Sequence, residues 1–325
     1  MIDERANQNN SVRRKIEAFS TTMTLPTVRR ALGVIEGEHA SRRRGGNDDL
    51  LDIRPYDTGD EARAIDWKIS ARSGQPMVVQ RERLVSGRVY LLMDVGREMN
   101  EYCASGERAY EVAANALCMV AALSLRRSDD VSLVFADNAS ITRVPFHGGF
   151  AHFERVLDKA LDKQWDAPRN VAALLDYAAR IRDRNAFVVI ATDSHGLDPD
   201  HIKRLRRIAQ THPCMVIDVS TINPFERHPI ESMPDAAITD AHTHRRVPAF
   251  LRTKRNAEAV STHDAYAIAA LERELTRCGT QFIHAPSSEA MLHAFLTLIS
   301  RAQQGAYAYR PAPQPASVDA PGGNQ

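Results

Sequence analysis

Two short apolar runs, each ending in an aspartate, constrain the fold of this chain more than any other feature. Residues 89–94 read VYLLMD and residues 186–193 read AFVVIATD, without the alternation of polar and apolar residues that a half-exposed strand shows. Such runs are typical of strands that are buried on both faces of a parallel sheet. They predict that Asp94 and Asp193 lie at the carboxyl ends of neighbouring strands.

Helices are predicted between these strands. The helical segments are 107–125, 150–161, 171–181, 201–210, 256–278 and 288–304, and further strands are expected at 213–219 and 280–284. Residues 131–146 favour a hairpin, which would add one antiparallel edge strand. The alternation predicts an α/β fold, with an open, mostly parallel sheet and helices on both faces.

The composition changes along the chain and predicts its division. Residues 1–32 indicate a short helix around 12–19 and a connector, 33–88 a small β-rich segment, and 89–308 the α/β domain. An insertion at about 221–255 contains four prolines, and the Pro- and Gly-rich tail 309–325 is expected to be disordered.

Overall composition predicts a globular, cytoplasmic protein. Of the 325 residues, 43% are hydrophobic and 26% charged, and the net charge of +1 gives no bulk attraction to nucleic acid or membrane. The four cysteines form no CxxC pair, which favours reduced thiols. No apolar run reaches the ~20 residues of a membrane span.

Asp94, Glu98 and Asp193 are the candidate metal ligands. Two acids at adjacent strand ends, with Glu98 in the following loop, could present hard oxygens to Mg²⁺. The other interpretation is that the aspartates accept backbone N–H bonds where helices begin. We favour this second interpretation and expect no cofactor, with Mg²⁺ as the alternative.

These strand ends resemble a von Willebrand factor A (vWA) domain, in which one strand ends in Asp-x-Ser-x-Ser and a later one in Thr-Asp. Asp94 and Thr192-Asp193 match that pattern, whereas Gly96 and Glu98 replace the serines. The resemblance implies a Rossmannoid fold with a degenerate form of the metal-ion-dependent adhesion site.

The segment before the α/β domain carries a longer signature. It contains Gly37-Glu38-His39, Arg44-Gly45-Gly46, Asp52-x-Arg54-x-Tyr56, Gly59-Asp60-x-x-Arg63-x-Ile65-Asp66-Trp67 and Ala71-Arg72. This run closely resembles the DUF58 family of bacterial proteins, in which such a segment precedes a vWA-like domain. The chain is similar to the soluble branch of that family. The resemblance implies partnership with a MoxR-type AAA+ ATPase.

Two sets of residues are candidates for partner binding. The first comprises Arg54, Arg63, Asp66, Trp67 and Arg72, and the second comprises Lys203, Arg204, Arg206 and Arg207. In the first set we expect Trp67 to be an apolar anchor, with a docking surface as the alternative, and the arginines to pair with acids or to dock a partner. The second set forms the outer face of a helix, and a solvated face is its usual explanation. If it binds a partner, an acidic protein surface is favoured over nucleic acid, because aromatic residues are not interleaved with it.

The remaining motifs are weaker. His242 and His244 have a spacing that metal sites use, yet they lie in the Pro-rich insertion, where a solvated loop is favoured. Ser194 and His195 are adjacent and cannot form a nucleophile–base pair. There is no GxxxxGK[ST] phosphate loop.

The sequence therefore predicts a non-enzymatic interaction module, an adaptor or co-chaperone of the ATPase in client maturation or stress-related remodelling. The client is not identifiable from the sequence. The alternative is a divalent-metal-dependent ligand-binding or hydrolytic protein that uses Asp94, Glu98 and Asp193.

Overall fold

The computed structural model describes residues 2–36, 49–57, 65–82, 87–163, 165–226, 238–239 and 245–308. Its main feature is a six-stranded sheet of order β5-β4-β3-β6-β7-β8. The strands are β3 (Arg88–Asp94), β4 (Asp130–Ala136), β5 (Ile141–Val144), β6 (Phe187–Thr192), β7 (Cys214–Val219) and β8 (Gln281–Ala285). Every neighbouring pair is parallel except β4 and β5, which form the predicted antiparallel edge. The predicted mostly parallel α/β sheet is confirmed.

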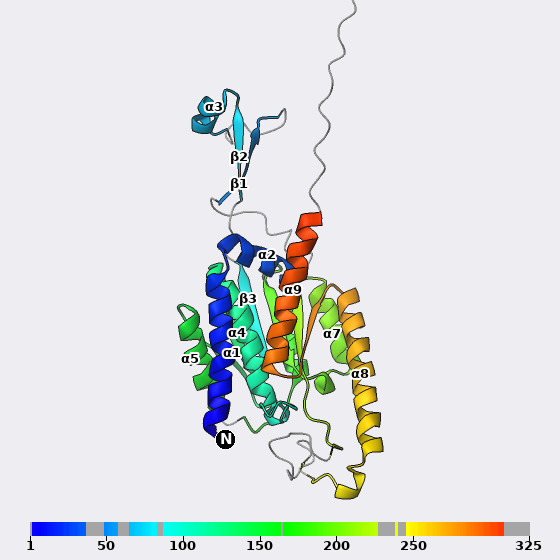
Figure 1. Ribbon diagram of the computed structural model, residues 1–325. Coiled ribbons are helices and arrows are strands. Elements are labelled where there is room, and N and C mark those ends of the chain that lie inside the picture. Colours follow the sequence, from blue (N-terminus) through cyan, green and yellow to red (C-terminus); the bar gives the residue numbers. More distant parts are fainter. Residues whose placement is uncertain are drawn as a thin grey trace, which may run out of the picture.

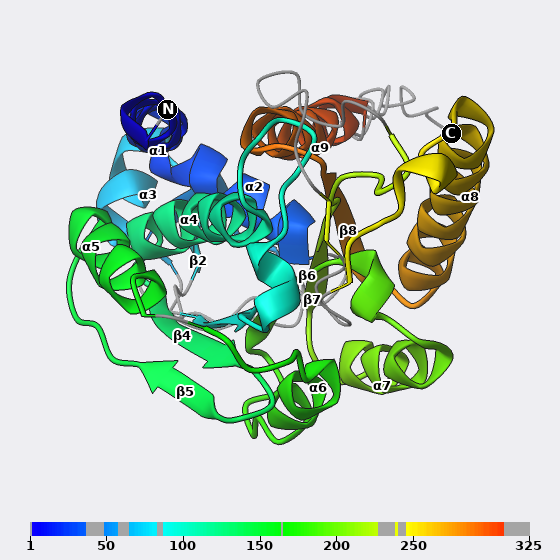
Figure 2. The same cartoon turned by 90° about the horizontal axis from the view of Figure 1, so that it is seen from below.

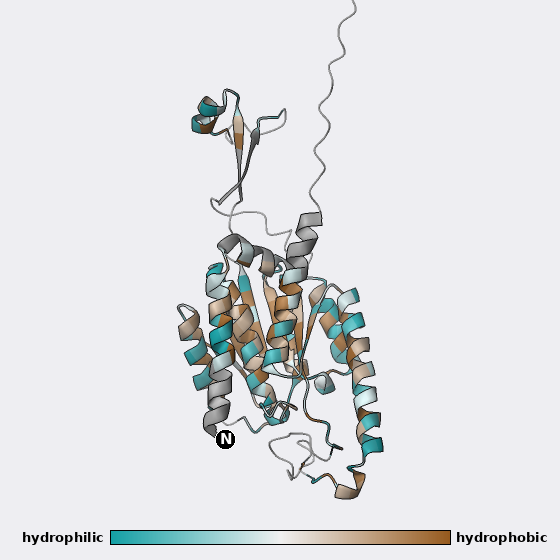
Figure 3. Cartoon of the chain, viewed as in Figure 1, coloured by the Kyte–Doolittle hydropathy of each residue, from teal (hydrophilic) through white to brown (hydrophobic). Residues whose placement is uncertain are grey.

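Helices cover both faces of this sheet (Figures 1 and 2). One face packs against α1 (Ile2–Thr22), α2 (Leu25–Glu36), α4 (Ala109–Arg126), α5 (Phe150–Leu161) and α9 (Ser288–Ala308). The other face packs against α6 (Val171–Ala179), α7 (Pro199–Ala209) and α8 (Lys254–Arg277). Apolar residues concentrate on the strands, as Figure 3 shows, because both faces of the sheet are removed from water.

The amino-terminal helix is longer than the sequence predicts. A short helix was expected around 12–19, whereas α1 spans Ile2–Thr22 and packs against α4. Val12 and Ile16 are buried one helical turn apart, and this apolar stripe holds α1 on the domain. The polar residues before Val12 show no apolar period in the sequence, so the sequence does not predict a helix that begins at Ile2.

A buried polar network also joins α1 to the domain. The Nε of Arg13 donates to Oδ1 of Asn115 over 2.9 Å, and its Nη1 donates to Oδ2 of Asp158 over 2.6 Å. Asn115, in the middle of α4, donates in turn to the hydroxyl of Ser288 over 2.9 Å. The only amide side chain of α4 is thereby satisfied although it is fully buried.

The small segment before β3 contains β1 (Asp49–Pro55), β2 (Met77–Glu82) and α3 (Trp67–Ser73). β1 and β2 pair antiparallel, and Ile65 bridges to Val78 on β2. The carboxylate of Asp66 caps α3 by accepting from the N–H groups of Lys68 and Ile69. The segment enters β3 at its amino end, which is opposite to Asp94 (Figure 1).

Only part of the predicted insertion lies in the described residues. Thr239 and Arg246 form an isolated bridge, and a short helix, η5 (Ala249–Leu251), precedes α8. His242 and His244 lie outside the described residues, and so does the tail 309–325.

Arg13→Ala should lower the free energy of unfolding by about 2 kcal/mol, because it leaves the buried amide of Asn115 without its donor. Urea denaturation of the two proteins measures the change. Lys15→Ala is the matched control: its ion pair with Glu289 is exposed, so its loss should cost less than about 0.5 kcal/mol. Equal effects of the two substitutions would contradict a stabilising role of the Arg13 network.

Candidate functional site

The structure brings the three predicted acids together at the carboxyl ends of β3 and β6. These strands pair directly, so Asp94 and Asp193, which follow the paired residues, lie side by side. Glu98 lies in η3 (Arg97–Asn100), the 3₁₀ helix that follows β3. All three residues are buried: 1% of the surface of Asp94 is exposed, 2% of that of Asp193 and 7% of that of Glu98.

Asp94 has both oxygens in hydrogen bonds. Its Oδ1 accepts from the backbone N–H of Gly96 and its Oδ2 from the hydroxyl of Thr192, each over 2.9 Å. Burial raises the pKa of Asp94 to about 6, although the nearby charge of Arg169 and these two hydrogen bonds oppose the shift.

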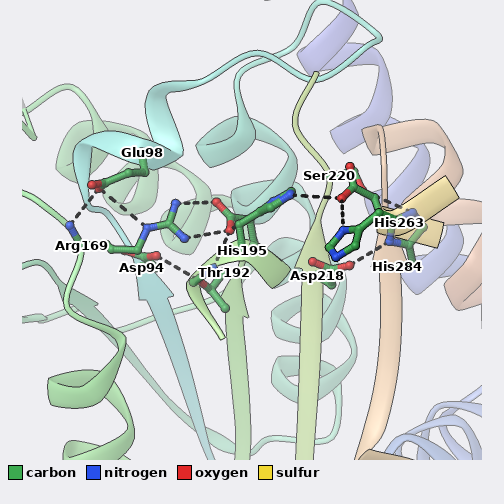
Figure 4. Close-up of polar contacts among 12 residues, drawn as sticks. Asp94, Glu98, Arg169, Thr192, His195, Asp218, Ser220, His263 and His284 are labelled. Atoms are coloured by element: carbon green, nitrogen blue, oxygen red, sulfur yellow. Dashed lines mark hydrogen bonds and ion pairs between the residues drawn. The ribbon is translucent and has the colours of Figure 1, made fainter. Parts of the chain in front are cut away.

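Arg169, which the sequence analysis did not single out, provides the positive charge of this site (Figure 4). Its Nη1 and Nη2 donate to the two oxygens of Asp193 over 2.8 and 2.5 Å, a bidentate pair. Its backbone N–H donates to Oε2 of Glu98 over 2.9 Å, and its Nε lies 3.8 Å from the same oxygen. Burial alone would lower the pKa of Arg169, but Asp193, Asp94 and Glu98 together raise it.

Two glycines make room for this arginine. A Cβ built on Gly96 would lie 2.4 Å from the Cα of Arg169, and one built on Gly196 would lie 2.4 Å from its Nη1. A serine at position 96, as in a vWA domain, would therefore collide with the backbone of Arg169.

The residues at these strand ends do not fit a divalent cation. Arg169 supplies a permanent charge and binds both oxygens of Asp193, while both oxygens of Asp94 accept other hydrogen bonds. Across the described ranges, no three or more His, Cys, Asp or Glu side chains are arranged to hold a metal. The backbone-capping interpretation holds for both aspartates, since Asp193 also accepts from the N–H of Gly196.

The basic face of α7 is partly neutralised. Lys203 pairs with Asp200 over 2.8 Å, Arg204 with Asp176, and Arg206 with Glu274. Arg207 is exposed. These pairs reduce the field that an acidic partner would meet.

The first set of partner-binding candidates differs in part from expectation. The prediction that Trp67 anchors the segment is wrong, because 70% of its surface is exposed. It follows the cap of α3 directly and projects outward, while Val78 and Ser70 are buried in its place. Asp66 is the helix cap, Arg72 is exposed, Arg54 lies on β1, and Arg63 is outside the described residues.

A comparison with models of protein families identifies the class to which this α/β chain belongs. The model described as "Protein of unknown function DUF58" matches residues 52–258. The chain belongs to the DUF58 family, as its signature segment predicts.

Curated relatives include uncharacterised proteins of Mycobacterium bovis and Mycobacterium tuberculosis. Each is 25% identical over 233 residues, which cover 70% of this chain and 72% of the relative. Their names assign no activity.

Two solved structures from Bacteroides also match. The conserved hypothetical protein BatB of Bacteroides thetaiotaomicron has 11% identity and a TM-score of 0.43, covering 67% of this chain and all of its own. An aerotolerance-related membrane protein of Bacteroides fragilis, with multiple mutations to serines, has 12% identity and a TM-score of 0.42, covering 66% of this chain and all of its own.

The cytoplasmic location predicted from the sequence is corrected by this comparison. The Bacteroides fragilis protein is by name a membrane protein, so a cytoplasmic location is no longer assigned to this chain. With TM-scores of 0.43 and 0.42, the two structures assign no other location to it. Within the part of the chain that the structure describes, none of the helices has the length and hydropathy to span a bilayer.

The wild type should lose free energy of unfolding as the pH rises and Asp94 ionises, and Asp94→Asn should remove this loss. The amide can keep both hydrogen bonds, accepting from Gly96 and donating to Thr192. Because the pKa of Asp94 is raised from 3.8 to about 6, ionisation destabilises the fold increasingly between about pH 4 and pH 6 and fully above that range. The shift of about two units, at 1.36 kcal/mol each, corresponds to about 3 kcal/mol.

The measurement is urea denaturation of both proteins from pH 4 to pH 7. The variant should gain stability relative to the wild type as the pH rises. Asp200→Asn is the control: Lys203 lowers the pKa of that exposed carboxylate below 3.8, so it is ionised throughout this range and its difference from the wild type should stay constant. A difference between Asp94→Asn and wild type that does not change with pH would contradict the burial argument.

Proposed function

We propose that the protein is an interaction module with a vWA-like domain, an adaptor or co-chaperone for a MoxR-type AAA+ ATPase in client maturation or stress-related remodelling. The ATPase supplies the energy, so this role needs no catalytic group in the adaptor. The main support is the exposure of Trp67 on a helix that is well fixed by its cap. The DUF58 signature around this residue connects the proposal to the ATPase.

Trp67 has the properties of an interface residue. Tyr56 is also exposed, at 39%, and both residues flank the start of β2: the N–H of Tyr56 donates to Pro76 and that of Asp66 to Met77. Tryptophan and tyrosine are enriched at the centres of protein interfaces, where they bury a large area with few rotatable bonds. The cap formed by Asp66 fixes the backbone of Trp67, the first residue of α3, before any partner binds.

The two ends of the α/β domain suit an adaptor. The segment with Trp67 enters β3 at its amino end, whereas Arg169 and the acids hold the loops at the carboxyl end. We assign the first end to the ATPase and the second, with loops 95–106, 147–150 and 194–200, to the client. Because Arg169 binds Glu98 in loop 95–106 and Asp193 beside loop 194–200, these two loops need no metal ion to take their shape.

Trp67→Ala should weaken capture of the ATPase at least tenfold, while the circular dichroism spectrum and the melting temperature stay unchanged. A hot-spot tryptophan contributes about 2 kcal/mol or more to binding. The measurement is a titration of the purified MoxR-type ATPase onto the immobilised full chain, with ATP and with ADP. Phe250→Ala is the matched control, since Phe250 is 77% exposed in η5 and remote from the DUF58 signature in sequence. Wild-type capture by the Trp67 variant, or no capture by any form, would refute the docking assignment.

The second candidate is a divalent-metal-dependent ligand-binding or hydrolytic protein, favoured by the approach of three buried acids. Calorimetric titration of the wild type with Mg²⁺ or Mn²⁺ should give no binding heat, because the guanidinium of Arg169 already neutralises Asp193. Tight binding that Asp94→Ala abolishes would instead establish this second function and overturn the first.

A further inference from the structure

A second polar cluster lies at the carboxyl ends of β7 and β8. Asp218 and His284 are direct partners across these parallel strands, and Nδ1 of His284 lies 2.9 Å from Oδ2 of Asp218. Ser220 directly follows β7 and lies two residues after Asp218. Its N–H donates to the carbonyl of Ala285 over 3.4 Å, which continues the hydrogen bonding between β7 and β8. Its hydroxyl lies 3.4 Å from Nε2 of His284 (Figure 4).

The order of these contacts fixes the role of each atom. A carboxylate can only accept, so Nδ1 of His284 carries the proton that Asp218 binds. The lone pair of Nε2 then faces the hydroxyl of Ser220. This is the sequence of contacts, Ser Oγ to His Nε2 and His Nδ1 to Asp, that defines a nucleophile with an oriented general base.

The carboxylate of this relay is buried, whereas the imidazole and the hydroxyl are partly exposed to solvent. The side chain of Asp218 is fully buried, that of His284 is 35% exposed, and Ser220 is intermediate. The Oδ1 of Asp218 has no hydrogen-bond partner among the described residues. The contact between Oδ2 and Nδ1 of His284 fixes the orientation of the imidazole ring, which is the task of the third residue in such a relay.

A purely structural role explains only half of this geometry. Neutralising Asp218 requires His284 alone, and it would not place a hydroxyl at the other ring nitrogen. Ser194 and His195 lie in η4 (Ser194–Gly196), the 3₁₀ helix after β6, but adjacent residues cannot form such a relay. The contact of 3.4 Å is long for a hydrogen bond, as is common before a substrate binds.

We propose that Ser220 is the nucleophile of an acyl-transfer site that accepts carboxylic esters, with His284 as general base and Asp218 as its positioning residue. The Oγ of Ser220 attacks the ester carbonyl carbon while its proton passes to Nε2 of His284. The bond to the leaving alkoxide then breaks, and His284 returns the proton to that oxygen. Water, deprotonated by the same nitrogen, hydrolyses the acyl-serine to the acid and free Ser220.

This activity is independent of docking to the ATPase, because it uses none of the residues assigned to that role. It lies beside the client-facing loops and would give the module a chemistry of its own. The two proposals can therefore fail separately.

The test is incubation of the full-length protein with p-nitrophenyl acetate, followed by release of nitrophenolate and mass spectrometry of the acetylated peptide. The wild type should be acetylated at residue 220. Ser220→Ala and His284→Ala should lower the rate about 100-fold, the usual contribution of a general base. Asp218→Asn, which reverses the tautomer of His284, should also be slow.

Ser261→Ala is the matched control, since Ser261 is an exposed serine of α8 without a base in contact. It should react like the wild type. Equal rates for Ser220→Ala and wild type, or acetylation that is spread over several serines and lysines, would overturn the proposal. The Ser220 variant changes one small side chain at the end of a strand, so its melting temperature separates a loss of activity from a loss of fold.

Discussion

The guanidinium of Arg169 is the interaction on which the carboxyl-end surface depends. Three acids are buried within reach of one another, and burying such charges without a partner would cost several kcal/mol each. Arg169 compensates with a bidentate pair to Asp193 and contacts to Glu98. Its hydrogen bonds thereby connect η3, the residue that follows β6 and the segment just before α6.

The same requirement explains the residues that depart from the vWA pattern. Gly96 stands where a serine ligand would be, and any side chain there would meet the backbone of Arg169. Gly196 leaves space for the guanidinium from the other side. The two glycines and the arginine are thus parts of one arrangement, in which the absence of side chains at positions 96 and 196 makes room for Arg169.

The sequence predicts the sheet because burial on both faces leaves a continuous apolar run, as in β3 and β6. It also predicts that Asp94 and Asp193 meet, because both follow such runs. It could not predict Arg169, whose partners Glu98 and Asp193 lie 71 and 24 residues away and share no period with it. Trp67 was misassigned because composition does not distinguish a buried aromatic residue from one that follows a helix cap. His284 meets Asp218 across 66 residues, through strand register alone.

Asp193 and Asp218, two buried aspartates at the carboxyl edge of the sheet, have different basic partners. Asp193 binds an arginine, which keeps its proton under all conditions in which the protein is folded, so the base beside this carboxylate is fixed in charge. Asp218 binds a histidine, the side chain whose charge changes most readily near neutral pH, and this histidine also contacts a hydroxyl. A static pair suits a docking surface, whereas a pair that can accept and return a proton suits catalysis. The choice of base beside each carboxylate therefore divides one sheet edge into a structural half and a half capable of chemistry.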